Sequence, residues 1–327
     1  MSISITNVRS ATAGEWDITW SECDHSTYFH SREWAEIWTF YSKGKICPAP
    51  ILITFSDGKK ALLPLSLQKN LAGFRKKYLS SPAGTFGGWI STHELSVEHA
   101  DLLTHYLTQK IDDITWRLNP YDHLALKAHI RPSKFDETHA LHLAGGFDTI
   151  YKGWTKGHRS AARKAQQHGV TIEFAYTLDD WYSYYQVYED SLQRWGNKAS
   201  SVYKWALFNE MLRRNSPYIK LWLAIYQDKV VAGALCFYAK KHAVYWHGAA
   251  LKDYFHLRPI NLLMYEAIKD ACERGYAWFD FNPSGKHTGV KAFKKSFGAN
   301  TLQSNIYSHP TGLEKVSRWI NRWLSWA

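Results

Sequence analysis

The spacing of hydrophobic residues changes repeatedly along the second half of the chain, and each change predicts a new element. Recurrence at every third or fourth position predicts helices, whereas alternation and short apolar runs predict strands. The expected helices cover residues 152–168, 178–195, 201–214, 259–274 and 288–297. The expected strands cover residues 171–176, 219–226, 230–239, 243–249, 276–281 and 301–308. This order suits one mixed sheet with helices on its faces.

The first half of the chain also mixes helices and strands. A helix is predicted directly after Ser31, because Trp34, Ile37, Trp38 and Tyr41 fall on one helical face. The other expected elements are strands at 49–55, 60–67 and 113–118 and a helix at 94–110.

A break near Ala144–Gly146 is the predicted domain boundary. It separates residues 1–146 from residues 147–310, and a final segment, 311–327, follows them.

The final segment has the pattern of an amphipathic helix. Trp319, Trp323 and Trp326 fall on one helical face, with Arg318 and Arg322 beside it. The pattern is typical of a basic helix that lies on a membrane surface. Docking of the helix on its own domain through the tryptophans explains the same pattern, and we favour that interpretation.

Charge divides unevenly between the two halves of the 327-residue chain. Residues 1–150 hold 15 basic and 16 acidic side chains, whereas residues 151–327 hold 25 and 13, a net charge of +12. The 45% hydrophobic and 21% charged content is that of a globular protein and excludes a disordered one. An excess of basic residues in one half of the chain favours an anionic partner. That partner could be nucleic acid, a nucleotide-bearing cofactor, a phosphorylated substrate or a membrane surface.

The cysteines and the N-terminus indicate a cytoplasmic protein. Cys23, Cys47, Cys236 and Cys272 are scattered without metal-ligand spacing, so no metal site is expected and a reducing compartment fits. The N-terminal residues lack the apolar core of a signal peptide, and no run of ~18 apolar residues is present.

The lysine-bearing stretch 280–300 is the first candidate site. A Pro/Ser/Gly/His/Thr/Gly loop precedes a short segment with Lys291, Lys294 and Lys295. Backbone N–H groups and three cations together suit an anionic, phosphate-bearing group. A glycine turn followed by a solvated basic helix explains the same residues.

Two further basic segments suit an anionic partner. Lys156, Arg159 and Arg163 occur at helical spacing, where like charges repel unless an anion offsets them. Arg258 and Asn261 flank the first turn of the long helix, where the helix dipole favours an anion. Solvated surface positions are the alternative for both segments.

Two strands carry the remaining candidates. Alternation along 243–249 sends Tyr245 and His247 to one face, where His247 could orient or deprotonate an amine. A purely structural histidine is the more common case. Asp280 and Asn282 alternate onto one face of the next strand, and Asp280 could hold an ammonium or neutralise a lysine.

Several of these patches together resemble the FemABX-like and related GNAT-superfamily acyltransferases. In the second half they are KGHRSAARKAQQHGVTIE, HGAALKDYFHLRPINLLMYEAIKDACERGYAWFDFN and GVKAFKKSFGA. In the first half, YFHSREWAEIW and SPAGTFGGW are similar to that family's opening helix and glycine turn. The likeness spans residues 28–308.

The resemblance implies an α/β (α+β) fold of two tandem GNAT-like domains that face one another across a cleft. Each domain is a mixed, mostly antiparallel sheet flanked by helices. The domains are expected at 1–146, joined by the helix at 311–327, and at 147–310. The implied reaction moves an activated acyl group to an amine.

By position, Lys291 and Lys294 match the family's lysines near the donor, and Arg159 and Arg163 match its basic helix. The roles of the other candidates are expected from the residues themselves. Near the donor, Lys294 or Lys291 supplies positive charge, and no covalent enzyme intermediate is needed. The expected catalytic residues are Lys294, Lys291, Asp280 and His247. The expected donor- or phosphate-binding residues are Arg159, Arg163, Lys156, Arg258, Asn261 and Lys295, and the expected acceptor-binding residues are Tyr245 and Asn282.

The donor in this family is aminoacyl-tRNA or acyl-CoA, used as a co-substrate and not as a tightly bound cofactor. Ordinary GNAT enzymes bind the CoA pyrophosphate with a glycine loop before the long helix. Here that place reads RPINLL, without glycine, which favours aminoacyl-tRNA. An acyl-CoA enzyme acting on a polysaccharide sugar or metabolite stays open. So does a non-catalytic nucleic-acid or membrane-surface binding protein.

Overall fold

The computed structural model describes residues 2–69, 76–128, 130–196, 199, 202–285 and 287–309. The predicted C-terminal helix at 311–327 lies outside these residues. The chain divides into two compact units: one runs to Asp136 and resumes at Gln303, and the other covers Glu137–Leu302.

The first unit contains a three-stranded sheet in the order β1-β3-β4 and a five-stranded sheet in the order β15-β7-β6-β5-β2. Its core is a cluster of buried aliphatic and tryptophan side chains between these strands and α3. Its strands are β1 (Ile5–Ser10), β2 (Ile46–Pro48), β3 (Ile51–Phe55), β4 (Lys60–Leu63), β5 (Ser66–Lys69), β6 (Lys76–Leu79), β7 (Ile114–Arg117) and β15 (Ile306–His309). Its helices are α1 (Ala13–Glu22), α2 (Arg32–Tyr41), α3 (Val97–His105) and α4 (His123–Lys127), with helical turns η1 (Tyr28–His30), η2 (Pro82–Gly84) and η3 (Tyr106–Lys110).

The second unit is built on a seven-stranded sheet in the order β14-β8-β13-β12-β11-β10-β9. Its strands are β8 (Glu137–His142), β9 (Thr171–Phe174), β10 (Ile219–Tyr226), β11 (Lys229–Tyr238), β12 (His242–Ala250), β13 (Trp278–Asp280) and β14 (Asn300–Gln303). Its helices are α5 (Gly146–Gly153), α6 (Lys156–Gln167), α7 (Leu178–Trp195), α8 (Trp205–Arg214), α9 (Pro259–Glu273) and α10 (Thr288–Lys295), with turns η4 (Leu143–Gly145) and η6 (Lys252–Leu257).

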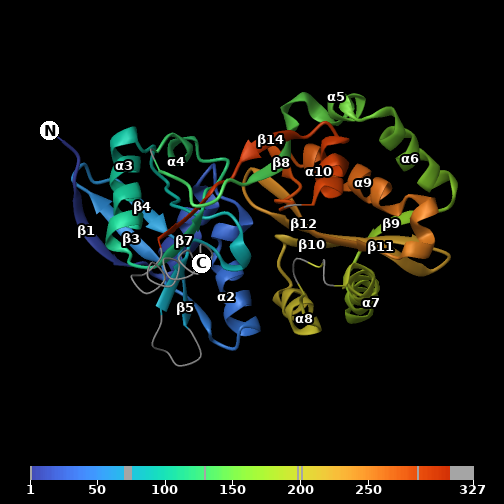
Figure 1. Ribbon diagram of the computed structural model, residues 1–327, viewed down its shortest axis with the longest axis horizontal. Helices are drawn as coiled ribbons and strands as arrows, with labels where there is room; N and C mark the ends of the chain where they lie inside the picture. Colours follow the sequence, from blue (N-terminus) through green and yellow to red (C-terminus); the bar gives the residue numbers. More distant parts are fainter. Residues whose placement is uncertain are drawn as a thin grey trace, which may run out of the picture. The chain divides into compact units, whose positions relative to one another are not determined.

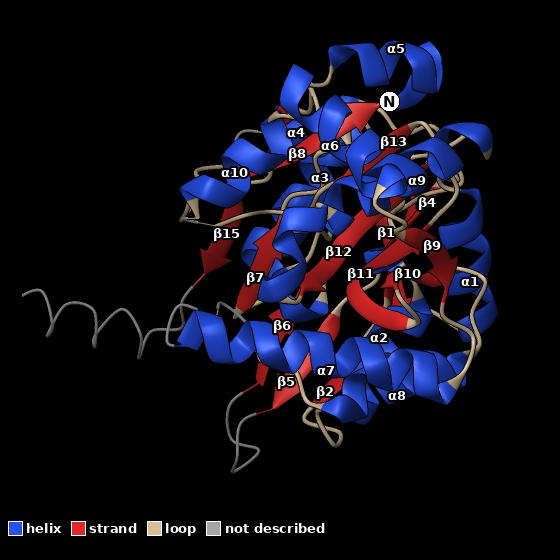
Figure 2. Ribbon diagram, turned by 90° about the vertical axis from the view of Figure 1, so that its right-hand side faces the viewer, coloured by secondary structure: helices blue, strands red, loops and turns tan. Residues whose placement is uncertain are grey.

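Helices cover both faces of this sheet. Figure 1 shows α7 and α8 below strands β10–β12, and α5, α6, α9 and α10 above them. Figure 2 shows the same strands side by side, with α7 and α8 along one face. The main core lies on the α9 side, where Leu263, Ile268 and Phe279 are fully buried. From β8 to β9, neighbouring strands pair antiparallel except β12 with β13, which is parallel.

Local sequence explains the long helix of the opposite face. Thr177 and Asp180 cap the start of α7 reciprocally, which satisfies N–H groups that have no partner within the helix. Trp181, Tyr184 and Tyr188 then recur at helical spacing and are buried against the sheet. The predicted helix at 178–195 is therefore confirmed.

Three predicted elements are divided in the structure. The predicted helix at 152–168 is interrupted at Trp154, whose backbone is extended and whose ring is buried against Phe297. The predicted strand at 60–67 is cut near Pro64, because proline has no N–H for a sheet, and β4 and β5 belong to different sheets. The predicted strand at 301–308 is two strands, β14 and β15.

The first part of the first unit ends at Asp136, ten residues before residue 146, the predicted end of the first domain. The reason is strand pairing: β8 pairs antiparallel with β13, so residues 137–142 join the second unit. At the other end, β15 pairs with β7 and joins the first unit. The Ala144–Gly146 signal does correspond to a turn, η4, but this turn lies within the second unit and not between the units.

Candidate acyl-transfer site

The short helix α10 places its three predicted lysines in different environments. Lys294 is buried, with 4% of its surface exposed, whereas Lys295 is exposed. The Lys294 ammonium donates a hydrogen bond of 2.5 Å to the backbone carbonyl of Asn282. Burial lowers the pKa of Lys294 to about 8, although the charge of Asp280 acts in the opposite direction.

Asp280 is fully buried at the end of β13. Its carboxylate accepts hydrogen bonds from the Thr138 hydroxyl at 2.6 Å and from the Asn282 N–H at 2.5 Å. The His242 Nε2 atom lies 3.7 Å from the other carboxylate oxygen. A buried carboxyl group needs such partners, and these contacts fix Asp280 in place near Lys294.

Asn282 does not extend the strand as predicted. Its φ of +61° is in the left-handed region, so the chain turns away from the sheet directly after β13. This turn points the Asn282 carbonyl at Lys294 and its N–H at Asp280. Asn282 therefore joins the cation and the anion through its backbone, a role that strand alternation did not predict.

Lys291 pairs with Glu137 of β8 at 3.0 Å. The Lys291 hydrogen bond is the main cause that lowers the pKa of Glu137. Lys291 is thus partly neutralised, and sequence spacing alone gave no sign of this partner 154 positions earlier in the chain.

His139, also on β8, is a site residue that the sequence analysis missed. Its ring is fully buried, and neither ring nitrogen has a hydrogen-bond partner among the described residues. Burial lowers its pKa, Glu137 raises it, and the lysines of α10 lower it further. Its only sequence signal was alternation with Glu137 along β8.

The start of the basic helix α6 meets the end of α10. The Thr155 N–H donates to the Ser296 carbonyl, and the His158 ring contacts Phe293 and Phe297 at centroid distances of 5.4 and 4.9 Å. The first turn of α6, which carries Lys156 and is followed by Arg159 and Arg163, therefore lies next to the end of the lysine-bearing helix. Lys156 and Arg163 are exposed, and Arg159 is partly buried.

The start of α9 joins the same region. The Asn261 side-chain nitrogen lies 2.8 Å from His158 Nδ1, which ties α9 to α6. Burial lowers the pKa of His158, and the charge of Arg258 lowers it further. Three basic segments, α6, α10 and the residue before α9, thus converge. We call their cations Lys156, Arg159, Arg163, Arg258, Lys291, Lys294 and Lys295 the donor-side cluster.

The prediction that Tyr245 and His247 share a face is wrong. The β11–β12 register shifts between Leu235 and Cys236, so that Cys236 pairs with Tyr245 and Leu235 pairs with His247. A β-bulge of this kind reverses the alternation of side chains. Tyr245 packs on the core beneath α9, and His247 faces α7 and α8.

His247 lies in a box of aromatic rings on that opposite face. Tyr184 Oη is 2.6 Å from His247 Nδ1, and the Tyr188, Tyr203 and Phe208 rings lie 4.5 to 6.1 Å away. Burial lowers the pKa of His247 to about 3, so the imidazole is neutral at physiological pH. It is a weak base there, suited to hydrogen bonding more than to proton abstraction.

No group of three metal-binding side chains occurs in the described part of the chain. Within the same residues, no helix combines the length and the apolar character that crossing a bilayer requires.

Comparisons with known proteins agree with this architecture. Residues 155–295 match the family model described as "Acetyltransferase (GNAT) domain". No curated protein sequence matches the chain significantly. The crystal structure of FemX aligns with a TM-score of 0.72 at 13% identity, over 95% of this chain and 99% of that chain.

Two lysylphosphatidylglycerol-synthetase structures are also similar. L-PGS from Bacillus licheniformis gives a TM-score of 0.53 at 14% identity, over 88% of this chain and 92% of that one. The C-terminal domain of a putative lysylphosphatidylglycerol synthetase from Agrobacterium fabrum gives 0.52 at 13%, over 82% and 86%. At such low identity these likenesses establish the fold.

Within the second unit, residues 155–295 thus match the GNAT acetyltransferase domain model, in line with the family that the sequence resembled. The chain as a whole has the two-domain architecture of FemX. The predicted fold class is confirmed, and the predicted cleft between the domains stays a prediction.

Proposed function

We propose that the protein is an N-acyltransferase that takes its acyl group from aminoacyl-tRNA and passes it to an amine. The acceptor is an amine of a cell-envelope precursor, a peptide or a small metabolite. The GNAT match over residues 155–295 and the FemX-like fold support acyl transfer. Because aminoacyl-tRNA is a cytoplasmic metabolite, the reaction belongs in the cytoplasm.

The start of α9 is the observation that carries the choice of donor. A CoA pyrophosphate binds GNAT enzymes at free backbone N–H groups there. In this chain Pro259 has no N–H, and the Asn261 N–H donates to the Arg258 carbonyl at 3.0 Å. Pro259 and Asn261 are also buried. Two of the first three positions of the helix are therefore closed to a pyrophosphate.

The donor-side cluster is the feature that suits a polyanion. Its exposed members are Lys156 and Arg163 on α6, Arg258 directly before α9 and Lys295 on α10. A polyphosphate backbone neutralises several separated cations at once, which a single pyrophosphate does not.

The reaction needs a neutral amine, a held carbonyl and a stabilised oxyanion. In this proposal Lys294 supplies the positive charge beside the donor ester, and Asp280 and the Asn282 carbonyl hold that ammonium in place. His247 takes no part in this step, because its ring faces α7 and α8 on the opposite side of the sheet from α10 (Figure 1). The amine attacks the ester carbonyl directly, the bond from that carbonyl to the tRNA ribose oxygen breaks, and the proton lost by the amine passes through solvent to the leaving oxygen.

A second candidate is an acyl-CoA-dependent N-acyltransferase. The description of the matched family model as an acetyltransferase domain favours it. It requires the pyrophosphate to bind at cations of the donor-side cluster and not at the start of α9.

The deciding experiment offers the protein an amine panel with either charged tRNA or a panel of acyl-CoAs and detects acylated products by mass spectrometry. We expect products with charged tRNA only, and their loss in Lys294→Ala. Products with acyl-CoA alone would overturn the donor assignment. No product with either donor, together with tight tRNA binding, would indicate a non-catalytic binding protein.

A further inference from the structure

A second site lies in the same unit, at the far end of α9 from the donor-side cluster. A groove of about 380 Å³ opens between the end of β9, the start of β10, and helices α7 and α8. Its volume is within the range of small-ligand sites. The residues that define it for the argument are Phe174, Tyr176, Trp181, Asn215, Lys220 and Arg274.

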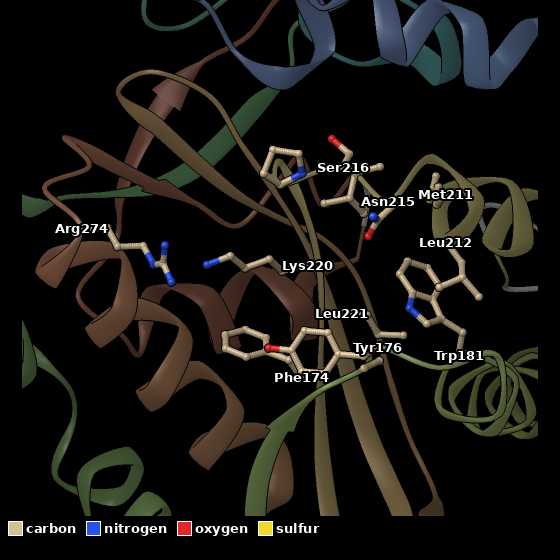
Figure 3. Close-up of a pocket in the computed structure, with 13 residues that line it drawn as sticks. Phe174, Tyr176, Trp181, Met211, Leu212, Asn215, Ser216, Lys220, Leu221 and Arg274 are labelled. Atoms are coloured by element: carbon tan, nitrogen blue, oxygen red, sulfur yellow. The ribbon is translucent and has the colours of Figure 1, made fainter.

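One end of the groove is cationic. Lys220 Nζ lies 3.4 Å from Asp270 Oδ2, and Arg274 Nε donates to Asp270 Oδ1 at 2.7 Å. A single carboxylate thus serves two cations, which leaves one positive charge in excess. Figure 3 shows the Lys220 ammonium and the Arg274 guanidinium pointing toward one another at this end.

Arg274 is suited to an additional anion. Half of its side-chain surface is exposed, and its two terminal nitrogens have no hydrogen-bond partner within the described part of the chain. A planar guanidinium with two free N–H edges matches the oxygen atoms of a phosphate.

The neighbouring end is aromatic. The Lys220 ammonium lies 5.2 Å from the Phe174 ring centroid, so the cationic end of the groove is in contact with its aromatic end. Next to Phe174, at a centroid distance of 6.2 Å, Tyr176 leaves 77% of its surface exposed. An exposed tyrosine that borders a groove offers a stacking surface for a planar ring.

A polar group completes the groove. Asn215 ends α8 in the left-handed conformation and exposes its side chain at the rim. Its amide carries both a donor and an acceptor, as the edge of a nucleobase does. Cation, stacking surface and amide therefore occur together along one wall (Figure 3).

From this arrangement we infer that the groove binds a nucleotide, with its base stacked on Tyr176 and its phosphate held by the two terminal nitrogens of Arg274 that Asp270 leaves free, with Lys220 as a neighbouring cation. Asn215 contacts the base edge.

The groove is separate from the donor-side cluster. Arg258 directly precedes α9 and Arg274 directly follows it, and a 15-residue helix is about 22 Å long. A mononucleotide at one end does not reach the other. The occupant is therefore a free nucleotide or a distant nucleotide of the donor tRNA, and only the tRNA source rests on the proposed function.

The test titrates the full-length protein with AMP by calorimetry and needs no turnover. We expect saturable binding that weakens about tenfold in Tyr176→Ser and in Arg274→Gln, because both the stack and the phosphate contact are needed. Adenosine and inorganic phosphate are each expected to bind more weakly than AMP.

Two matched controls keep the interpretation specific. Phe135→Ser removes an equally exposed aromatic ring, at 79% exposure, outside the groove. Lys269→Gln removes a cation of α9 whose side chain is 42% exposed and whose ammonium lies 3.9 Å from Glu273. Both are expected to bind AMP as the unmodified protein does.

No AMP binding at millimolar concentration, or equal binding by Tyr176→Ser, Arg274→Gln and the two controls, would overturn the inference. A second arm identifies the source of the nucleotide. A tenfold higher KM for aminoacyl-tRNA in the two groove variants assigns it to the tRNA. An unchanged KM, with AMP binding still impaired, assigns it to a free nucleotide. Failure of transfer with intact AMP binding would refute the proposed function alone.

Discussion

Replacing Lys294 by methionine should make the protein more stable and less active. The side chain is 4% exposed, and methionine fills a similar elongated space without a charge. The buried ammonium is held by the Asn282 carbonyl and by the field of Asp280. The question is whether these partners offset the loss of water around the charge.

The pKa answers that question. Burial lowers the pKa of Lys294 from 10.5 to about 8, so the charged form is disfavoured in the fold even with Asp280 nearby. A shift of this size corresponds to about 3 kcal/mol at pH 7. The neutral lysine still forms a hydrogen bond of about 1 kcal/mol, which methionine loses. Lys294→Met should therefore raise the free energy of unfolding by about 2 kcal/mol at pH 7.

The gain should depend on pH in a definite direction. Between pH 8 and 10.5 the unfolded chain binds more protons at this lysine than the folded one does, so the stability of the unmodified protein rises with pH. At pH 10 the destabilisation of the fold by the buried charge falls to about 1 kcal/mol. The hydrogen bond that methionine cannot form is worth about the same amount, so the two effects cancel. The stabilisation by methionine should then be close to zero.

Urea unfolding at pH 7 and pH 10, followed by tryptophan fluorescence, measures both values. Lys295→Met on the next position is the control, because Lys295 is exposed and should change stability little at either pH. Transfer activity should fall about 100-fold in Lys294→Met, as for the loss of one electrostatic group in an active site. Equal or lower stability of Lys294→Met at pH 7, or a gain that persists at pH 10, would refute the reasoning.

Four further variants test other parts of the second unit. Gly233→Ala should lower the free energy of unfolding by about 2 kcal/mol, because the new Cβ would lie 2.3 Å from the Tyr184 ring. Gly157→Ala should raise the free energy of unfolding by up to about 1 kcal/mol, because the position is helical and its Cβ would meet open space. Thermal unfolding measures both, and a more stable Gly233→Ala than Gly157→Ala would contradict the prediction. Tyr184→Phe should lower the free energy of unfolding by about 1 kcal/mol, because it removes the hydrogen bond to His247. Denaturant unfolding curves measure the change, and an unchanged free energy would show that this hydrogen bond has no net effect on stability. Arg163→Gln should raise the KM for aminoacyl-tRNA and leave kcat unchanged. It should also reduce by about one the slope of log binding constant against log salt concentration for tRNA. An unchanged slope would show that Arg163 does not contact the tRNA.

Sequence patterns predicted the second unit well where local signals and burial agree. The strand at 219–226 and the helix at 178–195 were predicted with the bounds that the structure gives them, because a turn or a cap marks their ends. Where an aromatic residue is buried at a turn, as at Trp154, the local pattern ran across the interruption.

The sequence predicted which residue types form the candidate site, but it did not predict the burial or the pairing of each side chain. Spacing identified three lysines on one short helix, yet it could not predict that Lys294 is buried while Lys295 is exposed. Burial depends on what packs above the helix, and the partners Glu137 and His139 come from a strand more than 150 positions away. The same distance explains why sequence reasoning missed both residues.

The sequence by itself determined the order of elements, the basic character of the second half and the likeness to FemABX-like acyltransferases. Only the tertiary structure decided which residues meet. One unpaired residue in β12 sends Tyr245 and His247 to opposite faces, and a left-handed Asn282 turns its backbone toward Lys294 and Asp280. Periodicity assumes regular backbone, and a bulge or a left-handed residue breaks that assumption. Long-range packing, which no local pattern encodes, then sets the charge that each side chain can carry.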